Sequence, residues 1–256
     1  MVSARICAIF STVLSIGIIK TLSLGKLIAK SPCCAVYAIL VCAIPLQSNS
    51  RVIVLRADGD NFSSGGKIAG FLEETPEDLS MLAQNVMTPE KIKKPVIAAI
   101  QGYCFGVGFE FSLACDFRIV TKDSQLSLPE MKIGMIPGSG GSARLAKMIG
   151  ISRTKNIIMR GKRLSGEEAF KLGIACELVD TPDLQHMTQK LVKELITVSP
   201  LAQRTVKSVL NATQNATLHT SIDLEGEAYG RLRSSNDFKE GVKSFSEKRS
   251  PSYKGN

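Results

Sequence analysis

The order of apolar and polar positions divides the chain near residue 50. Before that point lie two apolar stretches, 6–19 and 33–46, with a lysine-containing segment at 20–30 between them. After it, short runs of Val, Ile and Leu alternate with amphipathic stretches. The runs at 51–56, 94–100 and 117–121 predict buried strands, because they are short, β-branched and bounded by turn residues.

The amphipathic stretches predict helices. Residues 76–93 are expected to form one helix, with Thr75 at its N-cap. Ser165 is followed by two glutamates and is expected to cap a second helix. Residues 200–212 and 221–233 predict two more. Strands followed by helices, with glycine-rich turns between them, indicate the α/β class.

Composition limits the kinds of catalytic or metal site that the chain could hold. The chain has 256 residues, 44% of them hydrophobic and 21% charged, which is typical of a globular protein with a sizeable core. The two histidines, His186 and His219, lie in polar helical stretches and are expected at the surface, which argues against a Ser-His-Asp hydrolase. Because no CxxC pair occurs, a zinc site is not expected. Cys104, Cys115 and Cys176 lie in apolar stretches, which predicts buried free thiols and a cytoplasmic protein.

The net charge of +9 is unevenly distributed. Residues 1–57 hold six basic residues and no acidic one, whereas the rest holds 26 basic and 23 acidic residues. The main body is therefore only mildly basic. No basic run is interleaved with aromatic residues, so a nucleic-acid surface is not expected. A few lysines facing an anionic ligand would account for the remaining excess.

Two glycine-rich turns each follow a predicted strand, at 63–66 and at 102–108. In the second turn, Gly106 and Gly108 permit tight geometry and close approach by a ligand. A helix that begins there would direct free backbone N–H groups at an anion or an oxyanion. Two such turns could place two donors on one oxygen. Either turn by itself is also compatible with a purely structural role.

Two glutamates lie near these turns. Glu110 is expected in the first turn of the helix after Gly106, among Phe109, Phe111 and Leu113. Glu130 follows a strand-like run and Pro129. Burial and mutual repulsion would raise the pKa of one carboxyl, so that one group donates a proton while the other accepts one. A surface glutamate that compensates a helix dipole and an exposed loop acid are the alternative interpretations.

Longer motifs surround both glutamates. Residues 94–116 resemble the pattern KPVIAAVxGxxxGGGxxLxxxCD, and residues 128–145 resemble PExxxGxxPGxGGxxRL. The segments 62–66, 163–175 and 237–249 match further motifs in the same order. Together they resemble the enoyl-CoA hydratase/isomerase (crotonase) family over residues 51–254.

The resemblance implies a fold and an assembly. The fold is a spiral of ββα units, here the catalytic core at 51–195, followed by a helical trimerisation region at 196–256. The protein is then expected to form a homotrimer or a dimer of trimers.

The resemblance also implies a site. Glu110 and Glu130 would be the acid/base pair, and the backbone N–H groups of Gly66 and Val107 would form the oxyanion hole. Substrate or coenzyme A contacts are implied at Ser64, Lys67, Ile68, Gly106, Pro137, Gly138, Phe245 and Lys248, the last two often reaching a neighbouring subunit.

The implied reaction is the addition of water to a 2-enoyl-CoA, because isomerases of the family generally keep only the second glutamate. No metal or redox cofactor is expected, and coenzyme A is part of the substrate. Lys67 and Ser64 depart from the common Asp and Ala, and the Ser-Gly-Gly turn also resembles members that make or break carbon–carbon bonds. A non-catalytic or RNA-binding relative is the third alternative.

Residues 1–50 depart further from the family. They show no sign of its opening strand pair, turn and helix, and they contain no acidic residue and four cysteines. A targeting segment is one interpretation, and a membrane segment another, although its apolar core is short for a span. A reading-frame or gene-model error is the favoured one.

Overall fold

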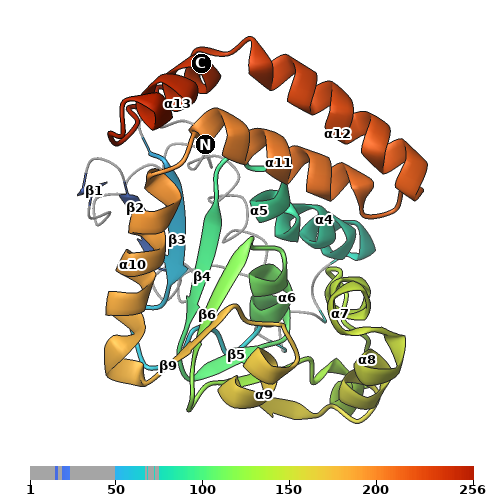
Figure 1. Cartoon of the computed structure of the whole chain (residues 1–256). Helices are drawn as coiled ribbons and strands as arrows, with labels where there is room; N and C mark the ends of the chain where they lie inside the picture. The colour runs from blue at the N-terminus through green and yellow to red at the C-terminus, as the bar shows by residue number, and fades with distance from the viewer. Residues whose placement is uncertain (1–14, 17–18, 24–49, 67, 69–71, 73–74) are drawn as a thin grey trace, which may run out of the picture. The chain divides into compact units, whose positions relative to one another are not determined.

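The computed structural model describes residues 15–16, 19–23, 50–66, 68, 72 and 75–256 (Figure 1). The described residues fall into two compact units. One comprises those of 1–92 and 96–189, and the other comprises 93–95 and 190–256. The candidate targeting, membrane and frame-error features of residues 1–50 fall mostly outside the described part.

The first unit is built on a sheet of the order β1-β2-β3-β4-β6-β9. Its central strands, β3 (Val52–Arg56), β4 (Val96–Ile100) and β6 (Phe117–Thr121), are parallel and nearly fully buried, as the apolar runs predicted. The parallel strand β9 (Glu177–Val179) extends the sheet beyond β6.

The other edge of this sheet differs from the sequence-based expectation. β2 (Ile19–Ser23) pairs in parallel with β3, and β1 (Ser15–Ile16) pairs antiparallel with β2. A strand pair therefore precedes β3 where none was predicted. Only five residues form β2, and they do not alternate between apolar and polar, so their pattern does not identify a strand.

A second, smaller sheet has the order β5-β7-β8. It contains β5 (Tyr103–Phe105), β7 (Gln125–Ser127) and β8 (Arg163–Ser165). β5 and β7 are parallel, and β7 and β8 are antiparallel. The chain leaves β5 directly into helix α6 (Val107–Leu113), whose seven residues include six buried ones.

The predicted helix at 76–93 is in fact two helices, α4 (Pro76–Val86) and α5 (Thr88–Lys91). Pro89 explains the division, since it has no N–H to continue the first helix and favours the first turn of a new one. The cap predicted at Ser165 is confirmed, because its side chain and that of Glu168 form a capping box at α9 (Gly166–Lys171). The first unit further contains η3 (Glu130–Ile133), α7 (Gly141–Ile149), α8 (Ile151–Ile158), η4 (Thr181–Asp183) and the start of α10 (Leu184–Ile196).

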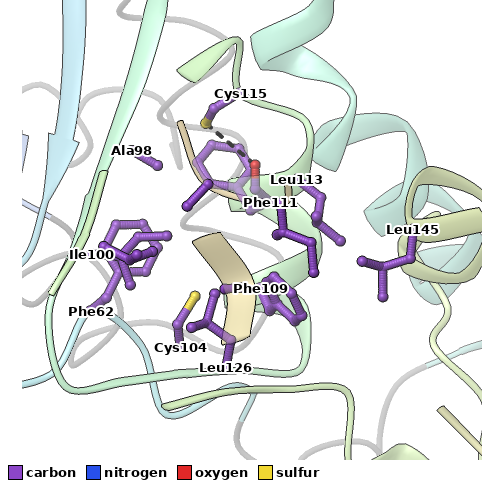
Figure 2. Close-up of a cluster of buried hydrophobic side chains, with 14 of the residues drawn as sticks. Phe62, Ala98, Ile100, Cys104, Phe109, Phe111, Leu113, Cys115, Leu126 and Leu145 are labelled. Carbon is purple, nitrogen blue, oxygen red and sulfur yellow. Dashed lines mark hydrogen bonds between the residues drawn. The ribbon is translucent and has the colours of Figure 1, made fainter. Parts of the chain in front are cut away.

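Helix α6 lies within the apolar core of the first unit (Figure 2). Phe109 and Phe111 of this helix are buried together with Leu126 of β7 and Leu145 of α7. Burying four such side chains contributes roughly 1.5–3 kcal/mol each, which fixes α6 between the small sheet and α7. The helix that carries Glu110 is thus a rigid part of the core.

The second unit is helical. It contains the end of α10, then α11 (Pro200–Thr213), α12 (Leu218–Arg233) and α13 (Asn236–Ser246). α11 packs on α12, and α12 on α13. Side chains of Ser199, Thr217 and Ser235 cap the three helices. α11 and α12 agree with the helices predicted at 200–212 and 221–233 to within a few residues.

Two remaining expectations concern exposure. Cys104 and Cys115 are buried free thiols as predicted, but Cys176 is exposed. Cys176 lies at the turn before β9, where its Sγ donates a hydrogen bond to the carbonyl of Arg118. In the described part of the chain, no helix is long and apolar enough to cross a membrane.

Candidate active site

The site begins at the junction of β5 and α6. Gly106 has φ +52°, a backbone conformation that favours glycine, and turns the chain from the strand into the helix. Val107 is the first residue of α6, so its N–H has no acceptor within the helix. This N–H and those that follow it make the N-terminal end of α6 a donor site for an anion.

The glycine-rich turn at 63–66 is held beside this helix end. The N–H of Ser63 donates to the carbonyl of Tyr103, and the N–H of Phe105 donates to the carbonyl of Ser63. A Cβ at Gly108 would collide with the Ser63 side chain, so glycine at this position permits the close approach. Gly66 ends the turn and is half-buried, as is Val107.

Glu110 projects from the first turn of α6 into a dry environment. Only 2% of the residue is exposed. Its Oε1 atom accepts hydrogen bonds from the N–H of Ser139 at 2.8 Å and from that of Gly141 at 2.9 Å. Burial raises the pKa of this carboxyl, while the two N–H donors and the positive charge of Arg144 partly oppose the rise. The carboxylate is therefore buried, fixed in orientation and more basic than a free glutamate.

Glu130 is the first residue of η3, directly after β7 and the buried Leu128. It is half-buried, and its Oε2 atom is inaccessible to solvent without a hydrogen-bond partner among the described residues. Burial raises the pKa of Glu130 to about 6; its own backbone N–H opposes the rise, and the charge of Glu110 adds to it. Near neutral pH this carboxyl is poised between donating and accepting a proton.

The two glutamates lie near the same end of α6 in the first unit. A Cβ on Gly106 would lie 3.1 Å from Oε1 of Glu130 and 3.8 Å from the Cα of Gly65. Glu110 lies one turn further along the same helix. The structure thus brings together three segments that are separated in sequence: the 63–66 turn, the N-terminal end of α6 with Glu110, and η3 with Glu130.

The other predicted contact residues are more dispersed. Pro137 is buried and Gly138 exposed, in the segment that joins η3 to α7. Ser64 is exposed, and Ile68 is 59% exposed. Lys67 lies outside the described residues.

Phe245 and Lys248 belong to the second unit. Phe245, at the end of α13, is 87% exposed and lines a groove of about 530 Å³ formed by that unit's helices. Lys248 is exposed and has φ +54°, the left-handed region. Their predicted contact with coenzyme A stays a prediction.

Sequence reasoning missed the groups that hold Glu110. Ser139 and Gly141 act through backbone N–H groups, which carry no side-chain signal. Arg144 belongs to the motif that follows Glu130, but its partner Glu90, 54 positions away, has no sequence signal.

No group of three or more His, Cys, Asp or Glu side chains in the described part of the chain is placed to hold a metal ion. His186 and His219 are exposed, as predicted.

Comparison with known proteins identifies the family. The family model described as enoyl-CoA hydratase/isomerase matches residues 44–256. The chain belongs to the enoyl-CoA hydratase/isomerase family. The match begins somewhat before residue 51, where the sequence motifs start.

Curated relatives within this family have different names. The enoyl-CoA isomerase/hydratase fer4 of Mycosarcoma maydis is 35% identical over 226 residues, which cover 85% of this chain and 82% of that protein. The carnitinyl-CoA dehydratase of Salmonella typhi is 34% identical over 220 residues, which cover 80% and 82%.

Solved structures confirm the fold class. The enoyl-CoA hydratase of Bacillus anthracis superposes with a TM-score of 0.82 at 32% identity, over 92% of this chain and 91% of that one. The predicted crotonase-like α/β fold, with helices at the C-terminus, is therefore correct.

Proposed function

We propose that this member of the enoyl-CoA hydratase/isomerase family adds water across the double bond of a 2-enoyl-CoA thioester. The observation that carries the proposal is the pair of carboxyls with raised pKa, Glu110 and Glu130, at the N-terminal end of α6. A reaction that needs one proton removed and another delivered requires two such groups in different protonation states.

The thioester carbonyl is assigned to the donors of Gly66 and Val107. Addition of water at the β-carbon moves electrons onto the thioester oxygen, which gains enolate character. The N–H groups of Gly66 and Val107 would bind this oxygen more tightly as its charge grows, and the helix dipole would add to the effect. Both donors belong to the backbone, so the Val107 side chain does not disturb them.

Glu110 is assigned as the base and Glu130 as the acid. Two N–H groups fix Oε1 of Glu110, which leaves Oε2 to take a proton from water as the oxygen attacks the β-carbon. Glu130, with a pKa of about 6 and an unpartnered buried oxygen, would protonate the α-carbon of the enolate. One proton leaves water and one reaches carbon, so a proton exchange between the carboxyls restores the site.

We propose that no resident metal or redox cofactor takes part, because the donors and carboxyls supply both the charge stabilisation and the proton transfers. Coenzyme A would be the part of the substrate by which the enzyme binds it.

We also propose a homotrimer, or a dimer of such trimers, that uses the second unit. This unit exposes apolar side chains on several helices, including Leu210 (60%), Ile222 (58%) and Val242 (53%). Such surfaces are typical of protein contacts. Phe245 and Lys248 would then reach the coenzyme A of a neighbouring subunit.

Isomerisation is the second candidate, since fer4 is named an isomerase/hydratase. A reaction at a carbon–carbon bond is a further candidate, because the turn at 63–66 resembles that of family members that make or break such bonds.

The test is incubation with a panel of short, long, branched and cyclic 2-enoyl-CoA thioesters, followed by mass spectrometry. A gain of one water supports hydration. A product of unchanged mass with a moved double bond would replace hydration by isomerisation, and a shortened acyl group would indicate bond cleavage. Binding without any product would indicate a non-catalytic relative.

A further inference from the structure

Arg144 connects the loop that holds Glu110 to a distant helix. Its Nε donates to Oε1 of Glu90 at 2.6 Å and its Nη2 to Oε2 of Glu90 at 3.1 Å, a bidentate pair. Its Nη1 donates to the carbonyl of Ser139 at 2.8 Å. The N–H of that same Ser139 donates to Glu110. A continuous chain of contacts therefore runs from α5 through α7 to the carboxyl of Glu110.

The loop is shaped around this guanidinium. Gly140 has φ +93°, and a Cβ at this position would collide with Nη1 of Arg144. Glycine therefore lets the cation lie directly against the backbone whose N–H groups, at Ser139 and Gly141, face Glu110.

The pair is also more buried than other ion pairs in the described structure. The side chains of Arg144 and Glu90 are 12% and 25% exposed, whereas those of Lys122 and Asp180 are 52% and 61% exposed. Exposed pairs contribute little to stability. A shielded bidentate pair fixes its geometry more firmly, because the planar guanidinium matches both carboxylate oxygens.

We propose that Arg144 is a positioning residue, oriented by Glu90, that holds the N–H groups of Ser139 and Gly141 on the Glu110 carboxyl. The inference rests on the proposed function for its catalytic consequence. Arg144 touches neither the substrate nor the reacting atoms in this proposal.

The charge of Arg144 has a second effect. Arg144 favours the ionised form of Glu110, while Glu130 on η3 disfavours ionisation of the pair. Glu90 on α5 partly neutralises Arg144. Of the other charged groups on elements that pack on α6, Glu77 on α4 and Lys147 on α7 are exposed, and β5 has no residue charged at neutral pH. Removing Arg144 is therefore expected to change the ionisation of Glu110.

The test compares Arg144→Gln with the unchanged enzyme. We expect kcat for hydration to fall roughly ten- to hundredfold, because a misplaced base costs this much, with little change in KM. The acidic limb of the kcat/KM profile should move to higher pH, since the pKa of Glu110 rises when the cation is lost. Arg144→Lys, which keeps the charge but loses the bidentate contact, should recover the pH limb more than kcat.

Glu90→Gln separates charge from position. It keeps an acceptor for Arg144 and removes a negative charge, so the acidic limb should move to lower pH, opposite to Arg144→Gln. If Arg144→Gln fails to fold, this variant and Arg144→Lys still test the positioning role of Arg144. Lys122→Gln, which breaks the exposed pair with Asp180, is the matched control and should change neither kcat nor the profile.

A titration that needs no turnover keeps the two proposals apart. The pKa of the Glu110 carboxyl is followed by ¹³C NMR in labelled protein, with and without the Arg144→Gln change. A pKa that is higher in Arg144→Gln, and partly raised in Arg144→Lys although that variant keeps the charge, supports positioning even if no thioester is hydrated. An unchanged pKa of Glu110, together with unchanged kcat in a folded Arg144→Gln enzyme, overturns the inference.

Discussion

The two glutamate-bearing segments differ in how firmly the fold holds them. Glu110 sits on a core helix, is 2% exposed, and has one oxygen fixed by two backbone donors. Glu130 sits on a single turn of 3-10 helix, is half-buried, and has a buried oxygen without a partner among the described residues.

The surroundings reinforce the contrast. The residues that flank Glu110 are buried, whereas Met131, Ile133, Met135 and Ile136 after Glu130 are 40–69% exposed. A proton donor to carbon has to meet the substrate, while a base that orients water benefits from a fixed direction. The difference in anchoring therefore fits two different roles for two chemically identical side chains.

Neutralising each carboxyl is expected to have the largest effect. Glu110→Gln and Glu130→Gln should each lower kcat for hydration by about 10²–10⁴-fold, because each removes one proton transfer. Binding of a saturated acyl-CoA, measured by calorimetry, should change little in both. The double variant should be scarcely worse than either single one, since the groups act as a unit. If Glu130→Gln kept full activity, another group would have to deliver the proton.

Releasing the far end of α6 is expected to cost stability next. Arg118 is buried and donates to the carbonyls of Ser112 and Cys115 at the end of this helix, and to that of Ile174. Arg118→Leu removes the donor of these three hydrogen bonds, although the carbonyl of Ser112 still accepts from the N–H of Cys115, and should lower the free energy of unfolding by about 3 kcal/mol. Chemical denaturation measures the loss, and exposed Arg160→Gln is the control, expected within about 0.5 kcal/mol. A loss that small for Arg118→Leu would show that the helix end needs no anchor.

Crowding each carboxyl through a neighbouring glycine is expected to have a smaller effect. A Cβ on Gly141 would lie 3.0 Å from Oε1 of Glu110, which two N–H groups hold in place, so Gly141→Ala should lower kcat roughly tenfold. Gly106→Ala meets the freer Glu130 instead, and its positive φ should lower stability by about 1 kcal/mol. Gly59→Ala, with open space around it, is the control for kinetics and unfolding. Equal losses of kcat in Gly141→Ala and Gly106→Ala would show that the two carboxyls are held equally firmly.

The smallest expected effect concerns pH and stability. The pKa of Glu130 in the folded protein is about 6, above its ordinary value of 4.5, so the folded state binds more protons between these values. Stability should therefore decrease as pH rises from about 4.5 to 6 and stay lower above that window. Glu130→Gln should raise the unfolding temperature at pH 7.5 by an amount equivalent to roughly 1 kcal/mol or less, after allowance for solvent screening, and should leave it unchanged at pH 4. A variant that is less stable at pH 7.5 would indicate that the ionised carboxyl has a stabilising partner.

Sequence by itself determined the α/β class, the central strands β3, β4 and β6, the helix capped by Ser165, the helices α11 and α12, and the family. These features depend on local composition and on ordered motifs, which a chain carries whatever its tertiary contacts. Sequence also singled out both glutamates, but each was still compatible with a non-catalytic role at the surface or in a loop.

Only the tertiary structure decided how the carboxyls differ. Burial, the donors at Ser139 and Gly141, and the Glu90–Arg144 pair arise from segments far apart in the chain. Backbone donors have no residue signature, and the raised pKa values depend on desolvation that only packing produces. The same reason explains the strand pair before β3, because its pairing partner rather than its own five residues makes β2 a strand.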